Sequence, residues 1–76
     1  GQALAVRGVQ VSAVRREPGG LVVRVFNPSQ ASATAEVDRD GAPVTGWVVD
    51  LVGRPLERFE GSVALRPWRL ATLRLD

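Results

Sequence analysis

Apolar and polar residues alternate along most of the chain, a pattern that indicates β-strands rather than helices. The most strand-like run covers residues 21–26, which are rich in β-branched side chains. Successive side chains of a strand point to opposite faces, and this run places apolar residues on both, with Arg24 as its one charge. The run therefore predicts a central strand. It should end at Asn27-Pro28-Ser29, because proline donates no hydrogen bond to a sheet.

Other segments of the chain repeat this alternation between turn signals. They cover residues 6–16, 33–39, 44–51, 56–59, 62–66 and 69–75. The sequence Glu17-Pro18-Gly19-Gly20 predicts a turn that joins the first of these strands to the central strand as a hairpin, and Asp40-Gly41 is a second hairpin signal. About seven short strands at this spacing predict an all-β fold, a small antiparallel β-sandwich of the immunoglobulin-like kind.

The phase of the alternation predicts which side chains form the core. In the first strand we expect Val9, Val11 and Ala13 to point inward and Val14 outward. In residues 44–51 we expect Trp47, Val49 and Leu51 to point inward, which would make Trp47 a core residue. Trp68 follows Pro67 at a bend, so its phase cannot be read in this way.

The domain organisation follows from length and composition. Seventy-six residues are enough for one domain, and we expect a linker or lead-in over residues 1–5 and a single β-sandwich domain over 6–76. The chain contains no methionine, which favours a fragment of a longer protein. No apolar run approaches the roughly 20 residues of a membrane span. Because there is no cysteine, redox chemistry does not reveal the compartment, and cytoplasmic localisation is our working hypothesis.

The high isoelectric point of 11.0 does not indicate a nucleic-acid-binding protein. Net charge is only +2, and every basic residue is an arginine. The arginines alternate with acidic residues and lack the aromatic platforms that RNA-binding sheets use. We therefore expect neither a nucleic acid nor a membrane as a partner.

The residue types exclude several kinds of active site. Without histidine or cysteine, the chain lacks a histidine base, a thiol nucleophile and the usual zinc ligands. Asp38 and Asp40 flank the second hairpin signal, where solvated charges are the simplest interpretation, and Asp50, Glu57 and Glu60 have arginines nearby that can form surface ion pairs. We expect no catalytic residue, cofactor site or metal site in this chain.

Three segments, taken in order, resemble the C-terminal β-domains of family 38 glycoside hydrolases, the α-mannosidases. They are GLVVRVFNP at residues 20–28, VDLVGRPL at 49–56 and LRPWRLATLRL at 65–75. The resemblance implies a non-catalytic tail domain of an enzyme that hydrolyses terminal α-mannosidic linkages with a zinc ion and an aspartate nucleophile elsewhere in the protein. Arg24, Asn27 and Thr72 match family positions, which implies structural roles in a turn cap and in strand pairing.

Two functions remain open at this stage. An accessory domain of an α-mannosidase would pack against the remainder of its own parent enzyme through an exposed apolar patch that includes Trp68 or Phe59. An autonomous carbohydrate-binding module would instead present a solvent-facing aromatic ring to a sugar, with Trp68 or Phe59 again the candidate contact. Zinc is expected in the parent's catalytic domain only.

Overall fold

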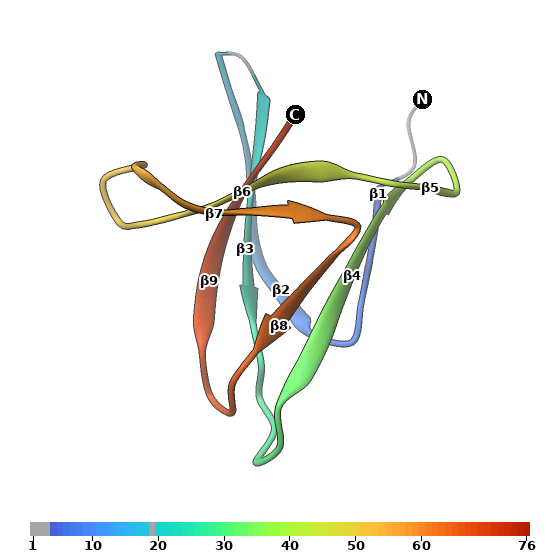
Figure 1. Cartoon of the computed structure of the whole chain (residues 1–76), viewed down its shortest axis with the longest axis vertical. Coiled ribbons are helices and arrows are strands. Elements are labelled where there is room, and N and C mark those ends of the chain that lie inside the picture. The colour runs from blue at the N-terminus through green and yellow to red at the C-terminus, as the bar shows by residue number, and fades with distance from the viewer. Residues whose placement is uncertain (1–3, 19) are drawn as a thin grey trace.

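The computed structural model describes residues 4–18 and 20–76, which fold into two antiparallel β-sheets with no helix among them (Figure 1). The nine strands of this part are β1 (Leu4–Arg7), β2 (Gln10–Glu17), β3 (Gly20–Phe26), β4 (Ala33–Arg39), β5 (Ala42–Pro43), β6 (Thr45–Val49), β7 (Pro55–Glu60), β8 (Ser62–Leu65) and β9 (Leu70–Leu75). The all-β antiparallel sandwich is confirmed. The number of strands exceeds the expected seven because the first predicted segment is divided into β1 and β2, and because β5 precedes the predicted segment 44–51.

The larger sheet has five strands in the order β2-β3-β9-β6-β7. β3 lies between β2 and β9, so the predicted central strand is confirmed. The predicted hairpin is confirmed as well, since Glu17 and Gly20 form its last pair; Gly19, the expected positive-φ residue of the turn, lies outside the described residues. Arg24 pairs with Thr72 across β3 and β9, in keeping with a role in strand pairing.

The smaller sheet is built around β4. β1 pairs with one edge of β4, while β5 and β8 share the other edge at different heights. Two side chains of β4, Ala35 and Val37, are fully buried, as the alternation of residues 33–39 predicts. They face Val23, Val25, Leu73 and Leu75 of the larger sheet, and these residues form the centre of the core.

The chain passes between the sheets at Gly8, so the single strand predicted over residues 6–16 is wrong. Gly8 has φ of +88°, and a Cβ there would lie 2.2 Å from the carbonyl oxygen of Thr34. Only glycine fits this close approach and this backbone conformation. Leu4 and Ala5, expected in the lead-in, belong to β1, whereas residues 1–3 lie outside the described residues.

A second passage between the sheets is closed by a ring of three backbone hydrogen bonds. The N–H of Val37 donates to Gly61, the N–H of Gly61 to Val44, and the N–H of Val44 to Val37, at 2.8, 2.8 and 3.0 Å. The three residues come from β4, from the β5–β6 connection and from the β7–β8 connection. This ring satisfies buried backbone groups where neither sheet can do so.

Val49 is buried as expected, but the predicted inward position of Trp47 is wrong, and Gly46 explains the error. Across β6 and β9, Gly46 pairs with Leu75 and Val48 with Leu73, so Gly46 and Val48 face the core. A Cβ on Gly46 would lie 2.9 Å from the ring of Phe59, which occupies the space that a side chain would need. Trp47 therefore lies on the outer face and is only half-buried.

The predicted phase of β2 fails at a bulge between Val11 and Ala13. Val9 packs against the core as expected. After the bulge, Ala13 pairs with Arg24 on the outer face and Val14 pairs with Val23 on the inner face, the reverse of the prediction. Every residue of β2 is nevertheless exposed, so the smaller sheet leaves the inner face of this strand uncovered.

Candidate docking surface

Asn27 anchors one end of the sandwich through its buried side chain. The residue is 1% exposed, and its Nδ2 group donates to the carbonyl oxygens of Ala31, Leu65 and Arg66 at 2.9, 3.2 and 3.1 Å. Its Oδ1 accepts a hydrogen bond from the N–H of Ser29 at 3.1 Å. The amide thus caps the turn after β3, as expected, and also binds the end of β8 in the opposite sheet.

The same anchor holds the turn that carries Trp68. The backbone N–H of Asn27 donates to Arg69 at 2.9 Å, and the N–H of Arg69 donates to Arg66 at 3.2 Å. Trp68 lies in this turn between Arg66 and Arg69, and its backbone has φ of +60°, which is rare for a residue with a large side chain. Figure 1 shows the turns after β3 and β8 at the same end of the molecule.

Of the two aromatic residues proposed from the sequence, Trp68 is exposed and Phe59 is not. Trp68 is 58% exposed, and its ring contacts that of Phe26 with the centroids 6.4 Å apart. Phe59 is 5% exposed and packs over Gly46 in the core. Phe59 therefore provides no contact surface in this structure, because its ring fills the inner space that the absent side chain of Gly46 leaves open.

An open groove of about 400 Å³ lies beside this turn, between the end of β8 and the ends of β6, β7 and β9. Its apolar walls, here called the leucine groove, are formed by Leu51, Leu56, Leu65, Leu70 and Ala71. Leu51, Leu56 and Leu70 are exposed, Leu51 to 93%. Leucines exposed together in one groove make this groove the candidate docking surface of the domain.

Most of this groove could not be predicted from the alternation of residues 44–51. Leu51, expected in the core, lies in the turn after β6 that Asp50 stabilises. Oδ1 of Asp50 accepts hydrogen bonds from the N–H groups of Arg54 and Val52 at 2.9 and 3.0 Å, and Oδ2 binds the Arg54 guanidinium at 3.0 Å. These contacts, the backbone N–H of Arg54 foremost, lower the pKa of Asp50. The Asp50–Gly53 spacing was the available signal of a turn.

Trp47 is partly covered by a charged neighbour. The Arg58 guanidinium lies 5.4 Å from the centre of the Trp47 ring, a cation–π contact. Arg58 also binds Asp76 at 2.7 Å, and Asp76 accepts a hydrogen bond from the hydroxyl of Thr45 at 2.9 Å. The Thr45 hydroxyl and Arg58 lower the pKa of Asp76. Trp47 is thus less open to a ligand than Trp68.

The carboxylates near the second hairpin form surface contacts. Asp38 binds the Arg7 guanidinium at 2.6 Å, and Glu36 lies 3.6 Å from the same group. Within residues 4–18 and 20–76, no three histidine, cysteine or acidic side chains gather where they could hold a metal ion. No helix in that part of the chain has the length and apolarity needed to cross a membrane.

Comparison with known protein families finds one match that covers residues 8–73. The matching model is the glycosyl hydrolases family 38 C-terminal beta sandwich domain. The chain belongs to this family. Neither the curated proteins nor the solved structures contain a match to the chain.

The segments that resemble family 38 domains converge on the surface described above. Residues 20–28 contain Asn27, residues 49–56 include the Asp50 turn, and residues 65–75 carry Trp68. The last two segments supply most of the lining of the leucine groove. In this family 38 domain, two of the three segments thus line the leucine groove, and the third supplies Asn27, which anchors the turn beside it.

We predict that Asn27→Ala lowers the free energy of unfolding by about 1–3 kcal/mol, because buried carbonyl groups lose their donor.

We also predict that Asn27→Asp destabilises the domain more strongly as the pH rises, because burial against carbonyl oxygens raises the pKa of the new carboxyl group in the folded state. Its stability deficit is then smallest below the pKa of an unfolded aspartate and grows as the pH rises through the raised folded value.

Urea unfolding measured across pH tests both statements. Ser29→Ala is the matched control, because it removes one exposed hydrogen bond to Ala31 from the same turn and should change stability much less. Equal unfolding midpoints for Asn27→Ala and the wild type would contradict the anchoring role.

Proposed function

We propose that this domain is a non-catalytic accessory domain of an α-mannosidase, and that its parent enzyme hydrolyses terminal α-mannosidic linkages with a zinc ion in a separate catalytic domain. The family match supports a family 38 parent. The chain contains no histidine or cysteine, which fits a domain that takes no part in zinc-dependent chemistry. Its contribution is therefore structural.

The leucine groove with Trp68 is the surface through which this domain packs against the remainder of its parent enzyme. The carrying observation is the joint exposure of Leu51, Leu56 and Leu70 in one groove, and of Trp68 on the turn whose residues Arg66 and Arg69 line that groove. Burial of each leucine would contribute about 1.5–3 kcal/mol before the costs of association. Arg66 and Arg69 also line or flank the groove and supply a polar rim of the kind that interdomain contacts have.

We expect the full-length protein that carries this domain to hydrolyse p-nitrophenyl α-mannoside. Hydrolysis should stop after treatment with a chelator and return on addition of zinc. The matched control is p-nitrophenyl α-glucoside, which should be cleaved near the background rate. Preference for the glucoside, or full activity after removal of metal, would contradict the proposed parent activity.

We expect Leu56→Asp combined with Leu70→Asp to destabilise the full-length enzyme without unfolding this domain. A charge in an interdomain contact loses apolar burial and remains desolvated and unpaired. The thermal half-life of activity should fall markedly. Thr34→Asp, an exposed strand position outside the groove, is the matched control and should leave the half-life unchanged. Equal half-lives for the Leu56→Asp/Leu70→Asp enzyme and the Thr34→Asp enzyme would contradict docking through the groove.

The exposed ring of Trp68 supports carbohydrate binding as a second candidate function, since sugars stack on open aromatic faces. In that case, titration with mannose and short α-manno-oligosaccharides should give saturable amide NMR shifts around Trp68, and Trp68→Ala should abolish them. Trp47→Phe is the matched control and should retain binding. The absence of any shift at millimolar sugar would exclude this candidate.

A further inference from the structure

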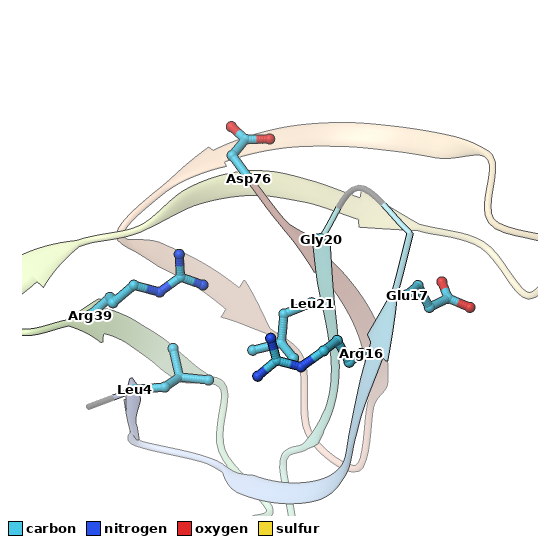
Figure 2. A pocket seen from close by; sticks show the side chains of 7 residues that line it. All are labelled: Leu4, Arg16, Glu17, Gly20, Leu21, Arg39 and Asp76. Carbon is cyan, nitrogen blue, oxygen red and sulfur yellow. The ribbon is translucent and has the colours of Figure 1, made fainter. Parts of the chain in front are cut away.

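A second opening, lined by residues other than those of the leucine groove, lies where the two sheets separate beside the β2–β3 hairpin (Figure 2). It is a cleft of about 560 Å³. The residues that line it are Leu4, Arg16, Glu17, Gly20, Leu21, Arg39 and Asp76. Leu4 comes from the smaller sheet and Leu21 from the larger one, and both are only partly buried. The cleft is thus an uncovered extension of the core.

Two arginines occupy inner-face positions at this cleft. Arg16 pairs with Leu21 across the larger sheet, and Arg39 pairs with Leu4 across the smaller one, so each arginine shares a face with a leucine. Figure 2 shows both guanidinium groups directed into the cleft from opposite sides. Within the described part of the chain, neither side chain forms a salt bridge or a hydrogen bond.

The two acidic residues of the cleft are already paired with arginines that do not line it. Glu17 binds Arg15 at 3.0 Å, and Figure 2 shows its carboxylate turned away from the cleft. Asp76 binds Arg58 at 2.7 Å. Both lining carboxylates are thus neutralised by other arginines, so the positive charge of Arg16 and Arg39 remains uncompensated, which makes the site complementary to a further carboxylate.

The strands on either side of the cleft have unoccupied edges. In the described residues β1 hydrogen-bonds only to β4, and β2 only to β3. Val11 and Val14 of β2 lie on the inner face yet are 43% and 56% exposed. A strand added at the free edge of β1 would lie over this uncovered face and would bring its side chains to both valines.

We propose that an extended acidic segment of another polypeptide region adds to the free edge of β1. Its apolar side chains cover Val11 and Val14, and one of its carboxylates binds between Arg16 and Arg39. The segment belongs to the remainder of the parent enzyme, an assignment that rests on the proposed function. Inward-pointing arginines could serve alone to keep sheet edges from aggregating, but that role does not account for the two exposed inner-face valines.

The experiment uses the ¹⁵N-labelled chain and two capped peptides, Val-Thr-Val-Thr-Glu and Val-Thr-Val-Thr-Lys, in which both valines and the charged residue share one face of a strand. The acidic peptide should shift the amide signals of β1 and β2 and should slow exchange of the β1 amide protons. Arg16→Gln combined with Arg39→Gln should weaken its binding about tenfold or more, since hydrogen bonds between charged groups are among the stronger ones. The matched control, Arg66→Gln combined with Arg69→Gln, should bind like the wild type.

Three results would overturn the proposal: equal binding of the basic peptide, shifts confined to the leucine groove, or glutarate alone binding as tightly as the acidic peptide without protecting β1. The last result would identify a small-anion site. If the double variant at the cleft loses the dispersion of its spectrum, Val14→Ser provides the second test and should also weaken binding of the acidic peptide. The experiment reads no hydrolytic activity, so its failure is distinguishable from failure of the α-mannosidase assignment.

Discussion

The buried side-chain amide of Asn27 is the interaction on which the arrangement of this domain depends. The two sheets share few direct backbone contacts, and at one end of the molecule this amide joins them, because it follows β3 of the larger sheet and donates to the end of β8 in the smaller one. The ring of hydrogen bonds between Val37, Val44 and Gly61 has the same effect elsewhere. Because these polar contacts determine how the two sheets are joined, valines and leucines of about the right size are sufficient to fill the core.

The anchor also relates the fold to the candidate function. Asn27 holds both ends of the turn that projects Trp68, so the ring is exposed on a fixed backbone rather than on a free loop. The Asp50 turn gives Leu51 a similarly fixed position on the other side of the groove. A surface ordered before association loses less entropy when a partner covers it, which is the physical basis for regarding this end of the domain as a docking surface.

Much of the fold could be predicted from local pattern, because β4 alternates without interruption and β3 is apolar on both faces, as a central strand should be. The errors lie where a glycine or a bulge alters the phase. The ring of Phe59, from the neighbouring strand, fills the space beside Gly46, so the inner position of Gly46 carries no side chain. The periodicity of residues 44–51 alone does not contain that information. Gly8 likewise requires glycine because of Thr34, which is distant in sequence. The exposure of Trp68 could not be read from the alternation because the residue follows Pro67 at a bend, and the leucine groove depends on two turns that are separate in the sequence.

The most direct measurement for the docking account is the accessibility of Trp68 to iodide, read by fluorescence quenching in a Trp47→Phe background. The account predicts efficient quenching in the isolated domain and strong protection of the same ring in the full-length enzyme, where the remainder of the protein covers the leucine groove. In the full-length protein, the signal should be assigned by difference from a Trp68→Phe variant. Equal quenching of Trp68 in the isolated domain and in the full-length enzyme would contradict the account.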